Sequence, residues 1–195
     1  MLNEKLKDYN IILASGSPRR QDFFNKLNLD FNIQVKSVEE IYDPSLKAAE
    51  ITDYLSKLKA AAFKNLKEND LLITSDTIVW NDGKAMEKAA DFKEAKQMLE
   101  NLSGKMHEVI TSVCFTSKYF QKTVHDRTKV WFKALSEEEI THYINTYKPF
   151  DKAGSYGIQE WIGYIGVEKI EGCYFNVMGL PTRLVYKTLS EIAAD

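Results

Sequence analysis

Apolar and polar residues follow two different periods along the first half of the chain. Short apolar runs, which are typical of strands, stand at 10–15, about 31–36 and 71–75. Between them, apolar residues recur every three or four positions over 17–27 and about 46–66, as in amphipathic helices. Strands that alternate with helices predict an α/β fold. The unbroken run 71–73 predicts a strand that is covered on both faces.

Turn and capping signals organise the second half. Asn81-Asp82-Gly83, between two apolar segments, is typical of a hairpin turn. Asp91 with Glu94 and Ser136 with Glu139 fit capping boxes at helix starts. The elements expected in this half are helices from these caps to about Leu102 and Tyr147, antiparallel strands at 109–116 and 123–132, a loop-like stretch 148–163, a strand near 164–170, a turn at 179–181 and a C-terminal helix.

Composition and charge narrow the function classes. The 195 residues make one ordinary domain or two tightly joined lobes, and 44% hydrophobic with 28% charged residues is typical of a globular protein. A net charge of −2 argues against a general nucleic-acid or membrane-surface binder. Cys114 and Cys173 are too few for a disulfide framework or a zinc site. No stretch is long enough to span a bilayer, and the charged N-terminus has no signal core, so we expect a cytoplasmic protein.

Two of the four arginines stand side by side in the segment Ser15-Gly16-Ser17-Pro18-Arg19-Arg20. Ser17 is predicted as an N-cap and Pro18 as the first helical residue, which places both guanidinium groups in the first turn. Cations there cost about 0.3–1 kcal/mol each unless an anion neutralises them. A strand, a glycine turn, hydroxyl groups and a helix start together are typical of a phosphate site, so we interpret the segment as a polyphosphate cradle. The alternative is a capped helix with solvated arginines.

Several carboxylates and lysines are further candidates. Asp76 is expected at the end of a central strand, where it could hold a hard cation or activate water, or could simply form a turn. Glu39-Glu40 could supply a second metal ligand or be a solvated acidic pair. Lys59 and Lys88 could reach a phosphate, and snorkelling is the alternative for Lys59.

The glycine-containing segment 151–159 ends in Gln159. Glycines let a backbone approach a ligand, and an amide can pair with the edge of a base, although a structural loop explains the glycines equally well. The three histidines share no spacing, so we assign them no catalytic role. Neither a P-loop motif nor a Gly-x-Ser-x-Gly elbow occurs, which argues against a P-loop ATPase and a serine nucleophile.

Five motifs taken together resemble the Maf family. They are Ala-Ser-Gly-Ser-Pro-Arg-Arg at 14–20, Ser-Asp-Thr-Ile-Val at 75–79, Leu-Ser-Gly-Lys-Met-His at 102–107, Asp-Lys-Ala-Gly-Ser-Tyr-Gly-Ile-Gln at 151–159 and Asn-Val-Met-Gly-Leu-Pro at 176–181. The resemblance covers nearly the whole chain, so 1–195 is expected to form a single Maf-like domain. It implies an α/β fold related to inosine triphosphate pyrophosphatases: an elongated, twisted mixed β-sheet flanked by helices, with two lobes and a central cleft.

The resemblance also implies a reaction and roles for residues. Members of the family cleave a nucleoside triphosphate to the monophosphate and pyrophosphate. Asp76 matches the proposed proton acceptor, and a divalent cation, Mg²⁺ or Mn²⁺, would be held by Asp76 with Glu40. The specificity positions are matched by Arg19, Thr77 and Gln159, and other polar positions of the cleft by Ser15, Ser17, Arg20, Glu40, Lys59, Lys88 and Asp91.

Within the family, this chain resembles the branch that acts on dTTP and UTP. It keeps the Gly-Ile-Gln of that branch at 157–159, but it has Glu87-Lys88-Ala89 where Glu-Lys-Pro is usual, and Ser75 before the acid where alanine is usual. The alternatives are a 7-methyl-GTP pyrophosphatase and a nucleotide-binding regulator of cell division that does not need hydrolysis. Apolar strand edges and Trp131 and Trp161, which we expect to be exposed, could support a homodimer, although buried packing explains them equally well.

Overall fold

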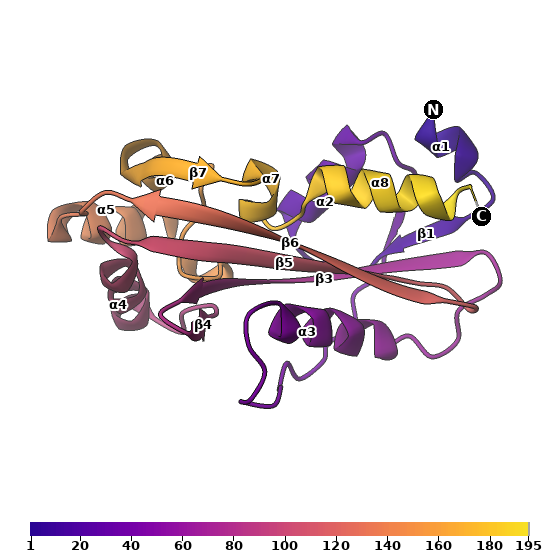
Figure 1. Ribbon diagram of the computed structural model, residues 1–195, viewed down its shortest axis with the longest axis horizontal. Coiled ribbons are helices and arrows are strands. Elements are labelled where there is room, and N and C mark those ends of the chain that lie inside the picture. The colour runs from indigo at the N-terminus through magenta and orange to yellow at the C-terminus, as the bar shows by residue number, and fades with distance from the viewer. Residues whose placement is uncertain (195) are drawn as a thin grey trace. The chain divides into compact units, whose positions relative to one another are not determined.

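The computed structural model describes residues 1–194, and within them a mixed seven-stranded sheet carries the fold. The strand order is β2-β1-β3-β5-β6-β7, and β4 pairs with β3 off this path. Helices lie beside the sheet, as Figure 1 shows. The expected α/β class with a mixed sheet and flanking helices is therefore confirmed. The strands are β1 (Asn10–Leu13), β2 (Asn32–Ile33), β3 (Asp70–Asn81), β4 (Lys84–Met86), β5 (Met106–Thr116), β6 (Gln121–Phe132) and β7 (Val167–Glu171). The helices are α1 (Leu2–Lys5), α2 (Pro18–Lys26), α3 (Ala49–Ala61), α4 (Phe92–Leu102), α5 (Glu137–Tyr147), the 3-10 helix η1 (Pro149–Asp151), α6 (Trp161–Gly166), α7 (Tyr174–Val177) and α8 (Thr182–Ile192).

The chain forms two compact units. Unit 1 comprises residues 1–76 and 111–126 and the chain from Gly179 onward, and unit 2 comprises residues 77–110 and 127–178. Strands β3, β5 and β6 each contribute residues to both units.

The parallel part of the sheet lies in unit 1. There β1 pairs in parallel with β2 and with β3, so that Leu13 stands opposite Ile33 on one side and Ile73 on the other. The run Leu71-Leu72-Ile73 is completely buried, which confirms the strand that we expected to be covered on both faces.

The strand that contains Asp76 is longer than expected. We predicted a strand at 71–75 with Asp76 at its end, but β3 continues to Asn81 and Asp76 lies in its interior. Thr77, Ile78 and Val79 are β-branched residues that favour an extended chain, which explains why the strand continues. The neighbouring β1 ends opposite Ile73, so Asp76 still lies beyond the end of its parallel partner.

Other boundaries differ in ways that depend on tertiary packing. The strand expected at 31–36 is reduced to β2, which stands at the end of the strand order and has a neighbour on one side only. The helix expected at 46–66 is α3, preceded by Ala48 at a φ of 52°. The strand expected near 164–170 begins at Val167, because α6 occupies the preceding residues. The short helices α1, α7 and η1 were not expected.

Local signals located the helix starts and the hairpin correctly. Pro18 is the first residue of α2, and the side chain of Asp91 accepts a hydrogen bond from Glu94 N at the start of α4. Ser136 and Glu139 form a complete capping box at α5. Asp82 and Gly83 both have positive φ, as a two-residue hairpin turn of type I′ requires.

The two tryptophans are not the exposed residues that we expected. Trp131 is half buried under Lys169, whose Nζ lies 4.5 Å from the ring centroid. Trp161 is also half buried and packs edge-on against His142 at a centroid distance of 4.9 Å. Both have partners within unit 2. They therefore do not provide the exposed aromatic contact that was one of the two grounds for expecting a homodimer. In the part of the chain that the structure describes, none of the helices has the length and apolar character needed to span a bilayer.

Candidate functional site

Lys59 joins two of the predicted acidic residues in unit 1. Its Nζ lies 2.6 Å from Asp76 Oδ1 and 3.1 Å from Glu40 Oε1. Lys59 stands in the last turn of α3, Asp76 on β3, and Glu40 in the irregular segment between β2 and α3. Lys59 therefore forms ion pairs with both carboxylates, and Glu40 is not merely a solvated acid.

Burial dominates the electrostatics of Asp76. The residue is only 6% exposed, and this burial raises the pKa of its carboxyl group above the ordinary value, while the positive charges of Lys59 and Arg20 act in the opposite direction. A desolvated carboxylate beside cations is a group that can accept a proton from water.

Arg20 ties together three parts of unit 1. Its Nε donates to the carbonyl of Gly179 at 2.8 Å, and its Nη1 donates to the carbonyl of Ser75 at 3.0 Å. Burial lowers the pKa of this guanidinium to about 10, so it stays charged at neutral pH. Arg20 thus fixes the 179–181 turn and the start of α2 next to the residue that precedes Asp76.

The turn before α2 retains features of an anion site. Ser15 is buried, and its Oγ accepts a hydrogen bond from Ser17 N at 3.3 Å. Ser17 occupies the N-cap position, but its side chain makes no capping hydrogen bond. A Cβ added to Gly16 would meet no atom within 4 Å, so the backbone there borders open space. With Arg19 half buried in the first turn, this geometry supports the phosphate cradle.

In unit 2, the structure connects Lys88 to the loop that ends in Gln159. Lys88 forms an antiparallel bridge with Ala153, and Gly154 N donates to Glu87 O at 2.9 Å. A side chain at Gly154 would begin 2.7 Å from Val79 Cγ2, so this position requires glycine. The loop is therefore fixed against the segment that carries Lys88.

Two further residues that the sequence predicted for the site, Asp91 and Thr77, lie in unit 2. Asp91 serves as the N-cap of α4, a structural role that explains its presence without a ligand. Thr77 is half buried on β3, directly after Asp76.

The amide of Gln159 offers an acceptor that no described residue uses. Its Oε1 is buried and has no hydrogen-bond partner within residues 1–194. A Cβ at Gly157 would lie 3.0 Å from Gln159 Nε2 and 2.9 Å from the carboxyl carbon of Glu160, so the ends of both side chains lie close against the backbone here. Buried amide oxygens in proteins are usually paired with a protein group, an ordered water or a ligand, so this atom is a candidate acceptor for a bound molecule.

A network that the sequence did not reveal holds this loop. The Tyr143 hydroxyl donates to Glu160 Oε2 and accepts a hydrogen bond from Gly157 N at 3.0 Å. Lys152 Nζ lies 3.0 Å from Glu160 Oε1 and 2.7 Å from Asp151 Oδ1. The helical apolar period of α5 predicts Tyr143 as a core residue, and no local signal shows where its hydroxyl group points.

Comparison with known proteins adds the family to this geometry. The family model described as Maf-like protein matches residues 10–192. The chain belongs to the Maf family. The Maf relatives include proteins named dTTP/UTP pyrophosphatase: one from Christiangramia forsetii is 60% identical over 98% of both chains, and one from Flavobacterium johnsoniae is 59% identical over 98% of this chain and 100% of its own. A third, from Phocaeicola vulgatus, is 50% identical over 97% of this chain and 99% of its own.

The Maf fold is also found in a distant solved structure. The Ham1 protein of Staphylococcus aureus matches 94% of this chain and 99% of its own with a TM-score of 0.50, at 13% sequence identity. At this identity the match supports the fold alone, and it agrees with the inosine triphosphate pyrophosphatase-like sheet implied by the motifs.

The acidic residues of this Maf protein suit a hard cation that also binds substrate. Within residues 1–194, no group of three or more His, Cys, Asp and Glu side chains is arranged to hold a metal ion alone. Asp76 and Glu40 nevertheless approach one point, where Lys59 Nζ lies. Mg²⁺ commonly takes one or two carboxylates from the protein and completes its shell with substrate phosphates and water, so this donor pair fits.

Proposed function

We propose that this protein is a nucleoside triphosphate pyrophosphatase that hydrolyses dTTP and UTP. The observation that carries the proposal is the buried Asp76 carboxylate paired with Lys59, on a chain whose relatives at 50–60% identity bear that activity in their names. The substrate would be cleaved between the α- and β-phosphates, leaving the nucleoside monophosphate and pyrophosphate.

Asp76 would act as the general base. Its carboxylate accepts a proton from the water whose oxygen attacks the α-phosphorus, the bond from that phosphorus to the bridging oxygen breaks, and pyrophosphate leaves with the bonding electrons. Lys59 holds the carboxylate in place at 2.6 Å. Arg19, Arg20 and the first turn of α2 would neutralise the triphosphate. Asp76 and Glu40 would hold Mg²⁺ or Mn²⁺, which when bound neutralises charge on the phosphate oxygens.

Gln159 would select the base. Uracil and thymine present an N3–H donor beside a carbonyl acceptor, and an amide can pair with both at once. The buried Gln159 Oε1 would accept from N3–H, while Nε2 donates to the carbonyl oxygen. Cytosine has no hydrogen on N3 and presents its donor on N4 instead, so it would have to shift in the site to pair with the same amide, and this shift would disfavour it.

The activity test uses purified protein with Mg²⁺ and pyrophosphate detection. We expect turnover of dTTP and UTP above that of dCTP, 7-methyl-GTP, ATP and GTP. Preference for 7-methyl-GTP would replace the pyrimidine assignment. Binding of dTTP without hydrolysis of any substrate would instead favour a nucleotide-binding regulator.

Asp76→Asn tests the general base. It should lower kcat for dTTP by about 10²–10⁴-fold, because the amide cannot accept the proton. Asp22→Asn is the control, since Asp22 is an exposed partner of Lys26 on α2. Near-normal turnover of folded Asp76→Asn protein would contradict the assignment.

Metal removal tests the acidic pair. Protein treated with EDTA should lose activity and regain it with Mg²⁺ or Mn²⁺. Glu40→Gln should raise the Mg²⁺ concentration for half-maximal activity by about 10-fold or more. Its neighbour Glu39 is the matched control, because it is exposed and forms no ion pair with Lys59. Equal Mg²⁺ requirements for Glu40→Gln and Glu39→Gln would remove Glu40 from the site.

We also propose a cytoplasmic location. Nucleoside triphosphates are found there, and Cys114 and Cys173 are both free thiols, as is usual in a reducing compartment.

A further inference from the structure

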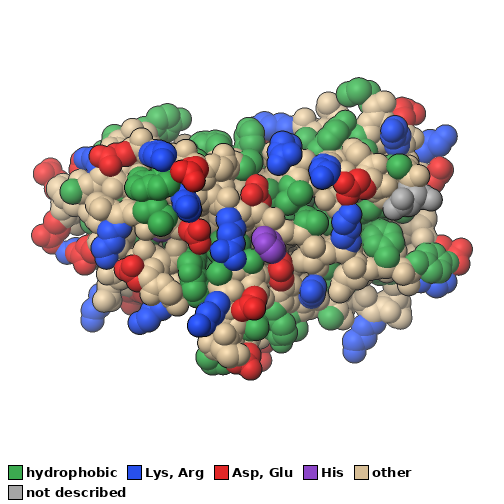
Figure 2. All heavy atoms as spheres, viewed as in Figure 1, with side chains coloured by type: hydrophobic (Ala, Val, Ile, Leu, Met, Phe, Trp, Pro, Cys, Tyr) green, Lys and Arg blue, Asp and Glu red, His purple; other side chains and the backbone are tan. Residues whose placement is uncertain are grey.

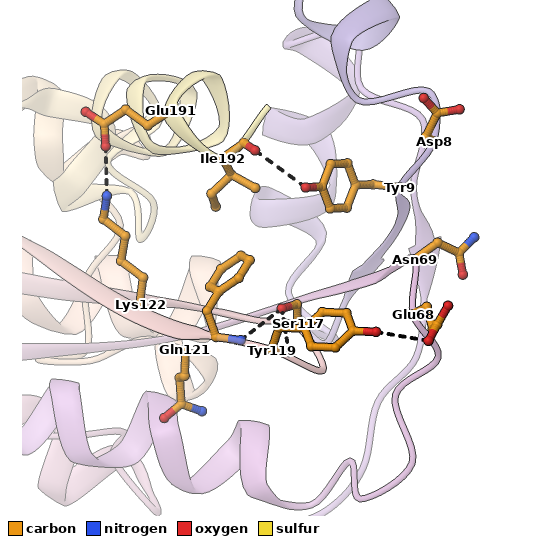
Figure 3. A pocket seen from close by; sticks show the side chains of 11 residues that line it. Asp8, Tyr9, Glu68, Asn69, Ser117, Tyr119, Gln121, Lys122, Glu191 and Ile192 are labelled. Atoms are coloured by element: carbon orange, nitrogen blue, oxygen red, sulfur yellow. Dashed lines mark hydrogen bonds and ion pairs between the residues drawn. The ribbon is translucent and has the colours of Figure 1, made fainter. Parts of the chain in front are cut away.

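Unit 1 contains a cavity of about 710 Å³ at the amino ends of its parallel strands. Asp8 and Tyr9 come directly before β1, and Glu68 and Asn69 directly before β3. The turn between β5 and β6 and the last turn of α8 complete the wall, as Figure 3 shows. This volume lies in the range of pockets that hold small organic molecules.

The cavity is separate from the residues assigned to hydrolysis. Asn69 lines the cavity, and Asp76 lies seven residues further along the extended chain of β3. At about 3.3 Å per residue the separation is about 23 Å. A small molecule in the cavity therefore does not reach Asp76 or the turn that follows the other end of β1.

Hydrogen bonds form the walls of the cavity without a ligand. Ser117 Oγ accepts hydrogen bonds from Tyr119 N and Phe120 N, both at 3.1 Å, and so fixes the β5–β6 turn. The Tyr119 hydroxyl donates to Glu68 Oε1 at 2.9 Å, and Lys122 Nζ donates to Glu191 Oε2 at 2.8 Å. Figure 3 shows these two pairs on opposite sides, so a ligand would enter a largely preformed site.

Aromatic rings supply most of the apolar lining. Tyr9, Tyr119 and Phe120 line the cavity together with Ile192. Tyr119 is 71% exposed and Phe120 is 37% exposed, which is a large exposure for aromatic side chains. Flat faces of this kind bind planar rings by stacking and attract cations through the negative ring face.

The lining carries more acidic than basic side chains. Asp8, Glu68 and Glu191 are acidic, and Lys122 is basic. Glu191 pairs with Lys122 and also with Lys187, and Glu68 pairs with Lys118 at 3.2 Å. Asp8 adds a further carboxylate at the rim, which would attract a cation to that edge.

We propose that this cavity binds a small planar aromatic molecule that carries a positively charged amine. The ring lies against Tyr9, Tyr119 and Phe120, and the amine faces the carboxylates of Asp8 and Glu68. The ligand is thus chemically distinct from the nucleotide substrate, and its site does not depend on the proposed hydrolysis.

Three probes separate the contributions of ring and charge. Tryptamine has both, indole-3-propionate has the same ring with a negative charge, and n-butylamine has the charge without the ring. Titrated into ¹⁵N-labelled full-length protein, tryptamine should shift the amide resonances of Tyr9, Ser117 and Tyr119 with a Kd on the order of 0.1–1 mM. The other two probes should bind at least about 10-fold more weakly. Turnover of dTTP should not change.

Variants test the assigned groups. Asp8→Asn and Tyr119→Ala should each weaken tryptamine binding by about 3- to 10-fold. Glu138→Gln, which removes an exposed carboxylate from α5, should leave it unchanged. Equal binding of tryptamine and indole-3-propionate, shifts confined to residues 15–20 and 76, or no shift at about 10 mM of any probe would overturn the proposal.

Discussion

Arg20 explains how a helix start can carry two adjacent cations. Its guanidinium donates to the carbonyl groups of Ser75 and Gly179, and charge-assisted hydrogen bonds of this kind are worth about 1.5–3 kcal/mol each. The unfavourable interaction with the helix dipole is only about 0.3–1 kcal/mol. For Arg20, a solvated side chain is therefore the wrong interpretation, and the residue has a structural role in addition to its charge.

Arg20→Lys should separate the two roles of this residue. A lysine ammonium keeps the charge but lacks the planar fork that reaches both carbonyl groups, so the free energy of unfolding should fall by about 1–3 kcal/mol. Urea denaturation measures the change. Arg183→Lys is the control, because Arg183 is exposed on α8. Equal stabilities of the two variants would show that the hydrogen bonds of Arg20 contribute nothing net.

His107 makes the stability of the protein depend on pH. The residue is buried on β5, its Nε2 lies 2.7 Å from the Tyr156 hydroxyl, and burial lowers its pKa to about 4. The unfolded chain has the ordinary value of about 6.5 and therefore binds more protons between these values. The free energy of unfolding thus decreases as the pH falls from about 6.5 toward 4, and His107 contributes no slope above about pH 7.5.

A non-titrating side chain should remove this slope. Between pH 7.5 and pH 5.0, His107 should account for about 2 kcal/mol of lost stability, so His107→Gln should lose that much less over the same interval. His142→Gln is the control, because His142 is exposed. The comparison is made by urea denaturation at both pH values. If His107→Gln kept the full pH dependence of the original protein, other groups would be responsible for it.

At the level of elements, the sequence was sufficient where the determining contacts are local. The capping box of Ser136 and Glu139 and the hairpin turn at Asp82 involve residues within a few positions of one another. The length of β3 was underestimated because it depends on which strands lie beside it. The short β2 follows from its place at the end of the strand order, which no local pattern states.

The candidate site also combines features that local sequence predicts with features that depend on tertiary contacts. The arginine pair, Asp76 and Gln159 stood in segments with recognisable local composition. The ion pairs of Lys59 with Glu40 and Asp76 join residues 19 and 17 positions apart, and spacing along the chain does not reveal them. The role of Tyr143 could not be predicted for a further reason. An aromatic residue on the apolar side of a helix is expected in the core whether or not its hydroxyl group supports a loop.

Tyr143→Phe should change base selection. Without the hydroxyl group, Glu160 and Gly157 N lose a partner, and the side chain of Gln159 beside them loses its fixed position. The ratio of kcat/KM for dTTP over dCTP should fall by about 10-fold. Tyr147→Phe is the matched control, since Tyr147 lies on the same helix and stacks on Tyr143 but is exposed. A lower stability with an unchanged substrate ratio would limit Tyr143 to a structural role.

At the scale of the whole molecule, the net charge predicts a weak repulsion of the triphosphate, whereas the local charge near α2 predicts an attraction. The chain carries −2 overall, and on the face drawn in Figure 2 acidic and basic side chains are interspersed. A triphosphate is also an anion, so the average field repels it weakly. Near α2, however, Arg19 and Arg20 lie in the first helical turn, and Lys59 is within reach of the same carboxylate as Arg20. At a distance shorter than the Debye length, about 10 Å at 0.1 M salt, the local groups determine the interaction.

The effect of salt on catalysis distinguishes the field of the net charge from that of the local cations. If the local cations dominate, kcat/KM for dTTP should fall several-fold between about 0.02 and 0.3 M KCl at constant free Mg²⁺, because salt screens their attraction for the substrate. Arg19→Gln should flatten this dependence, whereas Lys26→Gln, at the other end of the same helix, should not. If the net charge dominated, added salt would screen a repulsion and kcat/KM would rise. A rise would therefore show that the cations of α2 do not guide the substrate, whatever they contribute once it is bound.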